Sequence, residues 1–197
     1  DKLDSRDLDV EPDDRQEKLE SLDQKARGCV DCGISEHRNK VVFGEGAVRA
    51  RVMAIGEGPG AREDEQGLPF VGPAGELLRG GFRKVGLEEN DIYITNTVKC
   101  RPPNNRDPRE DELKACRFYL DRQLQLIEPD VILTLGNFAL QYCLGQDRRI
   151  TASRGQVYQW EGFKLVPSFH PAYILRNRSD ARKFYQDLKR VAIQLRE

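Results

Sequence analysis

Apolar residues in this chain occur either as short unbroken runs or as longer stretches at helical spacing. Unbroken runs with the length of buried strands occur at 51–56 (RVMAIG), 91–96 (DIYITN) and 130–136 (DVILTLG). The segment GQVYQWEGFKLVPSFHP (155–171) predicts two further strands around a turn at Glu161 and Gly162. The stretches between the strands follow a helical pattern instead.

Helices are predicted between and beyond these strands. The helical stretches cover 11–27, 73–86, 107–129, 137–145 and about 178–195. The stretch at 107–129 is the clearest, because one of its faces is apolar throughout. That face consists of Leu113, Cys116, Leu120, Leu124 and Ile127. The stretch at 73–86 opens with Pro73 but contains Gly80 and Gly81, which predict a weakened helix.

Strands and helices alternate along the sequence. This alternation predicts an α/β fold in which a mostly parallel sheet carries helices on both faces. We expect residues 1–197 to form one domain, with 1–28 as a charged N-terminal helical segment. Neither a secretion signal nor an apolar stretch near the roughly 20 residues that span a bilayer is evident. We therefore expect a cytoplasmic protein without membrane contact.

Charge is distributed unevenly, although the formal net charge is only −1. Residues 1–24 hold ten acidic and four basic side chains, whereas 148–197 hold eleven basic and four acidic ones. The near-neutral total excludes bulk basicity as a sign of nucleic-acid binding. The basic C-terminal part fits an anionic partner, and equally the solvated face of a helix.

Polar residues follow the predicted strands where the strands end. The segments GEGPG, TN, LGN and FHP come directly after four of them. Parallel α/β sheets bind ligands beyond the carboxyl ends of their strands. The four segments are therefore expected to converge on one pocket. This pocket would contain Glu57, Phe70, Asn96, Asn137 and His170.

The first of these loops, IGEGPGAREDEQGLPFVGPAG (55–75), is rich in glycine but also in acids. No Gly-Lys-Ser/Thr follows, and Pro59 and carboxylates occupy the turn, which disfavours a nucleotide phosphate. An aromatic ring beside an amide suits a nucleobase, since the ring stacks and the amide pairs with the base edge. Taken singly, Phe70, Asn96 and His170 are typical of a core ring, a cap and a buried imidazole. Their expected convergence favours a site.

Four of the five cysteines have a spacing typical of a metal centre. Cys29 and Cys32 form a C-x₂-C pair, and Cys100 and Cys116 lie far downstream. This pattern suits tetrahedral Zn²⁺ as well as an iron–sulfur cluster. A zinc-stabilised nucleic-acid-binding module without catalysis is therefore the alternative to an enzyme. The fifth cysteine, Cys143, has the pattern of a small apolar residue on a helix.

Several segments together resemble the family 4 uracil-DNA glycosylases, the thermostable type of bacteria and archaea. They are GEGPG, GLPFVGPAG, YITNTVKCRPPNNR, RGQVYQW and FHPAYILRN, and the resemblance extends from about residue 29 to residue 177. It implies a three-layer α/β/α sandwich with a central, mostly parallel four-stranded sheet. It also implies a monomer that excises uracil from single- or double-stranded DNA. The [4Fe–4S] cluster of this family would be held by Cys29, Cys32, Cys100 and Cys116.

The resemblance also implies roles for residues of the pocket. Phe70 would stack on the flipped uracil, and Asn96 would read its N3–H and O4. His170 would donate a hydrogen bond to O2 as negative charge develops there. The backbone of Glu57 and Gly58 would face the base and the attacking water.

The group that activates this water is left open by the sequence. The best-known uracil-DNA glycosylases have an aspartate where this chain has Gly58. Glu57, Glu63 and Asp64 are all candidates for the missing carboxylate. Glu63 is also expected near uracil C5, where a thymine methyl would collide, and Asp64 is expected among the substrate-binding residues.

The segment PAYILRNRSDARK is expected to contact DNA. Apolar Tyr173, Ile174 and Leu175 run into Arg176 and Arg178. An apolar side chain can fill the space that a flipped base vacates, while arginines hold phosphates. Leu175 is the predicted wedge, with Tyr173 or Ile174 as alternatives. A plain loop leading into a surface helix would have the same pattern.

Overall fold

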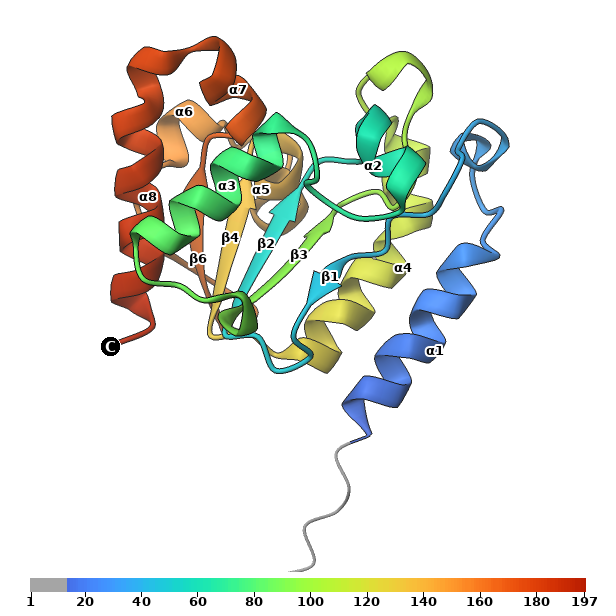
Figure 1. Ribbon diagram of the computed structural model, residues 1–197, viewed down its shortest axis with the longest axis horizontal. Coiled ribbons are helices and arrows are strands. Elements are labelled where there is room, and N and C mark those ends of the chain that lie inside the picture. Colours follow the sequence, from blue (N-terminus) through green and yellow to red (C-terminus); the bar gives the residue numbers. More distant parts are fainter. Residues whose placement is uncertain (1–13) are drawn as a thin grey trace, which may run out of the picture.

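The computed structural model describes residues 14–197. Its helices and strands alternate as the apolar pattern predicts (Figure 1). Of the helix predicted at 11–27, Arg15–Arg27 forms α1, which ends before Gly28. Residues 11–13 of that prediction, and the first half of the acidic N-terminal segment, lie outside the described residues.

One mixed sheet forms the centre of the protein. Its strands are β1 (Glu45–Gly46), β2 (Val52–Gly56), β3 (Ile92–Asn96), β4 (Val131–Leu135), β5 (Tyr158–Trp160) and β6 (Phe163–Ser168). The order across the sheet is β1-β3-β2-β4-β6-β5. The four central strands are parallel, as predicted, and a short antiparallel strand closes each edge. β1 was not predicted; it is two residues long and pairs with the edge of β3.

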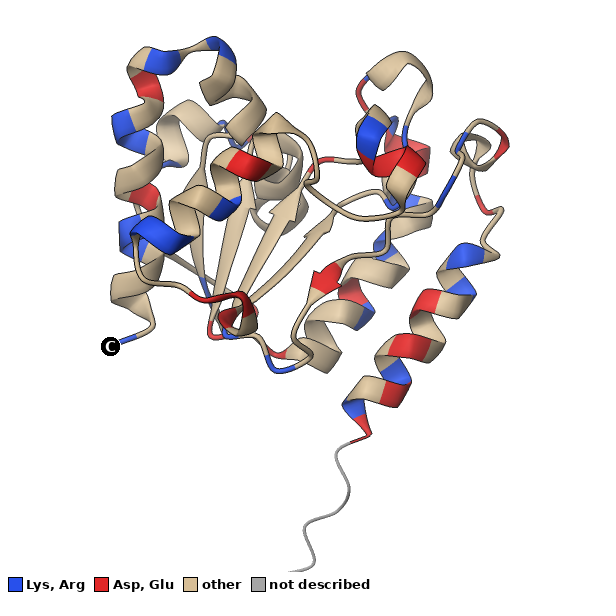
Figure 2. Cartoon of the chain, in the orientation of Figure 1, with Lys and Arg blue, Asp and Glu red and all other residues tan. Residues whose placement is uncertain are grey.

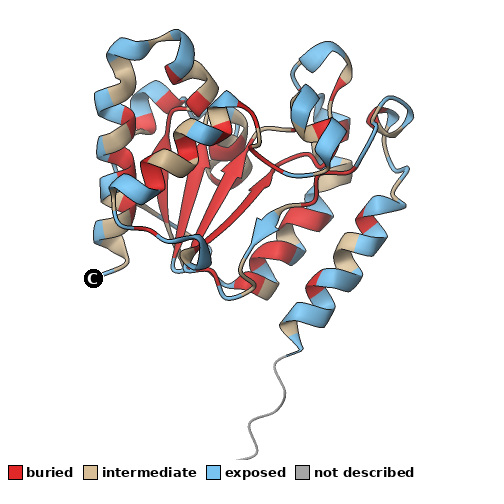
Figure 3. Cartoon of the chain, in the orientation of Figure 1, coloured by how far each residue is buried: buried red, intermediate tan, exposed pale blue. Residues whose placement is uncertain are grey.

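The parallel strands are buried on both faces. Every residue of β2, β3 and β4 is buried, which is why these strands are unbroken apolar runs in the sequence (Figure 3). The carboxyl ends of all four parallel strands meet at one edge of the sheet. The loops that follow them are therefore neighbours in space.

Helices cover both faces of the sheet and complete three layers (Figure 1). They are α2 (Ala61–Gln66), α3 (Pro73–Lys84), α4 (Glu110–Ile127), α5 (Asn137–Leu144), α6 (Ile150–Ser153), α7 (Pro171–Arg176) and α8 (Ala181–Gln194). α3 and α8 pack together on one face, whereas α4 and α5 cover the other. α1 lies on the outer side of α4.

The structure differs from the predicted elements mainly in short helices. α2, α6 and α7 lie in segments for which no helix was predicted. The last helix begins at Ala181 instead of 178, because Arg178–Asp180 forms a separate 3₁₀ turn. Figure 2 shows basic residues at this turn and along α8. In residues 14–197, no helix is long and apolar enough to cross a membrane.

The glycine pair does not break α3. Gly80 and Gly81 both lie inside the helix. A Cβ on Gly81 would collide with the side chain of Leu188 on α8. Gly81 therefore allows α3 and α8 to approach closely, so the cost in helix propensity is offset by packing.

Candidate active site and cysteine site

A cavity of about 200 Å³ lies beyond the carboxyl ends of the parallel strands. Six of the residues predicted for the site line it: Glu57, Gly58, Glu63, Phe70, Asn96 and His170. They come from the end of β2, from α2 and the loop after it, from the end of β3 and from the start of α7. The strand order thus assembles residues more than 100 positions apart.

Asn96, the last residue of β3, presents an unsatisfied polar atom to this cavity. The residue is only 1% exposed, and its Oδ1 has no hydrogen-bond partner within residues 14–197. Buried side-chain oxygens are rarely left unpaired in folded proteins. A Cβ on Gly56 would collide with this oxygen and with the ring of Phe70. Gly56 therefore leaves the space in which both groups face the cavity.

Phe70 is held in an unusual backbone conformation beside the amide. Its φ is 53°, in the left-handed region that non-glycine residues seldom adopt. The carboxylate of Glu63 fixes the following residues, because its Oε1 accepts hydrogen bonds from the backbone N–H groups of Val71 and Gly72 at 3.0 and 3.1 Å. Glu63 thus anchors the loop that carries the aromatic ring.

His170 lies next to Phe70 in the cavity wall, with ring centroids 5.6 Å apart and the ring planes tilted by 31°. Its Nδ1 accepts a hydrogen bond from the backbone N–H of Ala172 at 3.1 Å. Burial lowers the pKa of His170 to about 4, and Arg176 acts in the same direction. The imidazole is therefore neutral at neutral pH. Because Nδ1 is an acceptor, the proton lies on Nε2, which is free to donate.

Glu57 contributes a carboxyl group of shifted acidity. Burial, with a smaller contribution from Asp107, raises the pKa of Glu57 from 4.5 to about 7. Its backbone carbonyl is occupied, since it accepts hydrogen bonds from Thr97 Oγ1 at 2.5 Å and from the Val98 N–H at 3.1 Å. The carbonyl is therefore not available to a ligand, although Glu57 lines the cavity.

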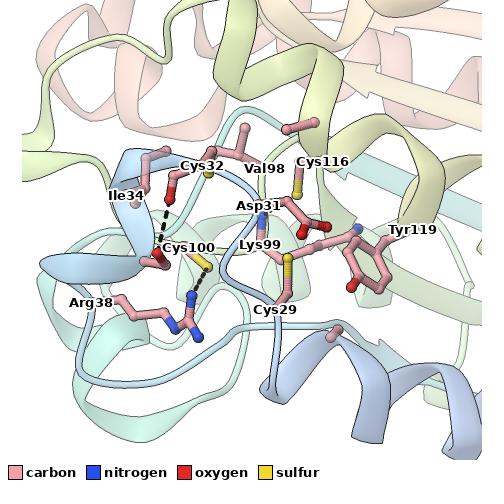
Figure 4. Close-up of a pocket in the computed structure, with 13 residues that line it drawn as sticks. Cys29, Asp31, Cys32, Ile34, Arg38, Val98, Lys99, Cys100, Cys116 and Tyr119 are labelled. Atoms are coloured by element: carbon pink, nitrogen blue, oxygen red, sulfur yellow. Dashed lines mark hydrogen bonds between the residues drawn. The ribbon is translucent and has the colours of Figure 1, made fainter.

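The four spaced cysteines meet at a second, smaller cavity (Figure 4). Cys29 and Cys32 come from the segment after α1, Cys100 follows β3 and Cys116 lies on α4. Within the described residues, no three Cys, His, Asp or Glu side chains are placed so that they could hold one metal ion. The thiols thus surround a small space instead of converging on one point. Cys143 lies elsewhere, buried in α5.

The surroundings of these thiols are basic as well as apolar. Burial raises the pKa of Cys100 to about 12 and also raises that of Cys116. Arg38 Nη1 lies 3.6 Å from the Cys100 sulfur, and the Lys99 N–H donates to the Cys116 sulfur at 3.2 Å. A metal centre would have to displace the thiol protons, and these donors would stabilise the resulting thiolates.

Residues 43–189 match the model of the uracil DNA glycosylase superfamily. The chain belongs to this superfamily. The match includes every pocket residue named above and two of the four cysteines, and the α/β/α fold agrees with it.

Three relatives are similar over nearly the whole chain. A type-4 uracil-DNA glycosylase of Thermotoga maritima is 43% identical over 91% of this chain and 92% of its own length. The type-4 enzyme of Sulfurisphaera tokodaii is 41% identical over 89% and 84%. That of Archaeoglobus fulgidus is 39% identical over 88% and 92%.

Two residues that were predicted for the pocket, Asn137 and Asp64, do not line the cavity. Asn137 is exposed at the start of α5, and its Oδ1 accepts a hydrogen bond from the Ile150 N–H at 2.9 Å. Asp64 is buried on the other side of α2, where its carboxylate accepts from the N–H and Nδ2 of Asn39 and from the Lys40 N–H. The pocket predictions for Asn137 and Asp64 were wrong, because both side chains are used to hold the backbone.

The loop after β3 supplies wall residues that the sequence reasoning missed. Pro102, Asn105 and Arg106 line the cavity. Arg106 is held by Glu112, with N–O distances of 2.6 and 2.8 Å. Within the segment YITNTVKCRPPNNR, only Asn96 was predicted for the pocket. The loop folds back because Cys100, within it, returns to the cysteine cavity.

Lys99 connects the two sites. Its side chain is fully buried, and Nζ donates to Thr95 Oγ1, to the Asn96 carbonyl and to Gln123 Oε1 at 2.5, 2.8 and 2.6 Å. Its own backbone N–H contacts the Cys116 sulfur, as described above. One residue therefore ties the backbone of the buried amide to the wall of the cysteine cavity.

The candidate DNA-contacting residues lie on α7 and the turn after it. Leu175 is 40% exposed, whereas Ile174 is buried. Tyr173 is stacked on Phe169 with centroids 4.9 Å apart, and its hydroxyl donates to Asp180 at 2.9 Å. Of the three apolar candidates, Leu175 has the most exposed side chain.

Proposed function

We propose that this protein removes uracil from DNA by hydrolysing the N-glycosidic bond, which releases free uracil and leaves an abasic site. The superfamily membership and the type-4 relatives support this reaction. The observation that carries it in this chain is the unpartnered Asn96 Oδ1, in a cavity that an aromatic ring and a neutral histidine also line.

The base would be held by stacking and by its edge. Phe70 offers a ring face to the flipped base, and stacking of this kind contributes about 1–3 kcal/mol per base. Asn96 Oδ1 would accept the uracil N3–H, and its Nδ2 would donate to O4. Cytosine presents the reverse pattern at these two positions, so the same amide would disfavour it.

The departing uracil carries negative charge that a donor must stabilise. His170 supplies the Nε2–H, because its Nδ1 is occupied by the Ala172 N–H. A neutral imidazole is a suitable donor, because its Nε2 still carries a proton that can hydrogen-bond to O2 as negative charge develops there. We assign this role to His170.

The attacking water would lie beside the Glu57–Gly58 backbone. Of the three acidic candidates, Asp64 is turned away and one oxygen of Glu63 is bound to backbone N–H groups. Glu57 is therefore the group that we assign to the water. Glu63 keeps the role of fixing the Phe70 loop, and its remaining oxygen would lie near uracil C5 and contribute to selection against thymine.

The cysteine site would hold a [4Fe–4S] cluster. The donor set fits, because four cysteine thiols line one cavity and [4Fe–4S] clusters are held by four cysteine thiolates. When bound, the cluster would join the segment after α1 to β3 and α4, which is a structural role. A zinc-only module would be colourless, whereas a cluster gives broad visible absorbance.

DNA would lie across the edge that bears α7. Leu175 would fill the vacated base position, and Arg176 and Arg178 would hold phosphates on either side. Both single- and double-stranded DNA would be bound as substrates, with the wedge needed only in a duplex.

The proposal is tested by incubating the purified protein with oligonucleotides that contain a single uracil, cytosine or thymine. Chromatography of the small-molecule fraction is expected to find free uracil from the first substrate and no free base from the other two. Tight binding to uracil-containing DNA without release of uracil would instead support the binding module.

A further inference from the structure

A second surface feature lies between α1 and α4, where a groove of about 390 Å³ opens to solvent. It is lined by Lys18, Ser21, Leu22, Lys25, Arg122, Gln125 and Leu126. The salt bridge between Arg15 and Glu128, with an N–O distance of 2.6 Å, ties the two helices together at one end.

The groove is built from one stripe of each helix. The residues from α1 are spaced by three and four positions, and so are those from α4, so each set shares a helix face. Leu22 and Leu126 are half-buried and form an apolar floor, whereas the polar side chains on the stripes are exposed.

The charge of the groove has a single sign. Lys18, Lys25 and Arg122 line it, and no acidic residue of the described chain does. Lys18 pairs with Asp14 at 2.6 Å, which leaves two cations without an acidic partner in the groove. Such a concentration of one charge attracts an oppositely charged partner.

An exposed aromatic ring stands beside these cations. Phe118 on α4 is 42% exposed. Lys25 Nζ lies 4.5 Å from its ring centroid, and the Arg122 guanidinium carbon lies 5.9 Å away. Phe118 does not line the groove itself, but it lies one helical turn before Arg122 on the same face of α4 and contacts both cations that do.

The groove is remote from the uracil cavity. α4 begins at Glu110, near the loop that lines the cavity, and runs back along the sheet. Gln125 lies fifteen residues farther along this helix, a distance of about 22 Å at 1.5 Å per residue. DNA held at the cavity edge is therefore not the natural occupant of the groove.

We propose that this groove binds an acidic peptide segment of a partner protein. Acidic side chains of the segment would lie against Lys25 and Arg122, and an apolar side chain would pack on Leu22, Leu126 and Phe118. The aliphatic side chains of Leu22 and Leu126 favour an apolar peptide side chain over a planar base, which stacks on rings. The proposal is independent of the excision reaction, because none of these residues lines the cavity.

The test uses the full chain and a fluorescein-labelled peptide in which glutamates flank a phenylalanine. Fluorescence anisotropy is expected to show salt-sensitive binding to the wild type. Lys25→Glu combined with Arg122→Glu should weaken it by about tenfold or more, since two attractions become repulsions. Phe118→Ser should weaken it as well, and a peptide with alanine in place of phenylalanine should bind less tightly.

Matched controls separate the groove from general charge. Lys189→Glu, an exposed reversal on α8, should leave peptide binding unchanged. Uracil release from a short oligonucleotide should be the same in all these variants. Peptide binding that is unaffected by the double reversal would overturn the proposal. So would displacement of the labelled peptide by an unlabelled single-stranded oligonucleotide without uracil, because it would assign the groove to nucleic acid.

Discussion

The buried Oδ1 of Asn96 has no partner in the described chain, although the residue is almost fully enclosed. An unpaired buried acceptor of this kind costs about 1–3 kcal/mol. Lys99 holds the Asn96 carbonyl, and Gly56 leaves room for the side chain, so the amide is kept in place against this cost. A ligand that donates a hydrogen bond to Oδ1 would remove the penalty, and uracil N3–H is such a donor.

The sequence did not show that Glu63 and Asp64 point in different directions. Both were predicted to lie in one loop, but they lie on the helix α2. Successive helical residues point about 100° apart. Glu63 therefore faces the Phe70 loop and the cavity, whereas Asp64 faces Asn39. Phe70, Asn96 and His170 could be predicted for the pocket because each lies at the end of a parallel strand or in the loop that comes after it.

The acidity of Glu57 predicts a pH dependence. Its pKa is about 7 in the folded protein, so its carboxylate form, which would act on the water, increases as pH rises through 7. His170 stays neutral above about pH 4 and does not contribute in this range. The single-turnover rate of uracil release should therefore rise between about pH 6 and pH 8, as Glu57 ionises.

Glu57→Gln should remove this rise, whereas Glu65→Gln, an exposed change on the same segment, should keep it. Stability has the opposite sign. The unfolded chain loses the Glu57 proton near pH 4.5 and the folded chain near 7, so this residue lowers stability as pH rises between these values. A Glu57→Gln protein with the wild-type pH–rate profile would show that another group acts on the water.

The long helices and strands could be predicted from the apolar pattern of the sequence, whereas the short ones could not. β2, β3 and β4 are unbroken apolar runs because both of their faces are covered. α2 and α7 are six residues each, too short for periodicity to be visible, and glycine or proline adjoins both. β1 exists because β3 offers a free edge, a property of the assembled sheet and not of its own two residues.

The α7 element predicts a difference between substrates. Leu175 is the exposed apolar residue of this helix. Leu175→Ala should slow uracil release from a U·A duplex more than from single-stranded DNA, since only the duplex must be opened. Ile193→Ala, another exposed aliphatic change, should affect neither substrate. Equal slowing on both substrates would exclude a wedge.

The cysteine site predicts a coupled loss of colour and stability. Cys100→Ala should abolish visible absorbance and lower the thermal unfolding midpoint, because the segment after α1 would no longer be joined to β3 and α4. Uracil release should fall too, since Lys99 links the Cys116 sulfur to the Asn96 backbone. Cys143→Ala, outside the cavity, should keep the colour. Full iron content in the Cys100→Ala protein would contradict the assignment.

At the scale of the whole molecule, strand order brings the residues of the cavity together. The carboxyl ends of the four parallel strands lie at one edge of the sheet. The cavity forms there, beyond the ends of β2, β3 and β6. The alternation of strands and helices was sufficient to predict this edge, and the family resemblance predicted the base. The fold of the loop after β3 was not predictable from periodicity, because its path is set by Cys100 and by the Arg106–Glu112 pair.

The most direct test of the account is the rate of uracil release by the Asn96→Asp protein. A carboxylate cannot donate to O4 and repels the departing anion, so single-turnover release should be slower by about 5-fold to 150-fold, or 1–3 kcal/mol. Asn137→Asp is the matched control, because its oxygen can still accept from Ile150 and it lies outside the cavity. We expect wild-type rates from this control. Wild-type rates from Asn96→Asp as well would show that the buried amide does not read the base.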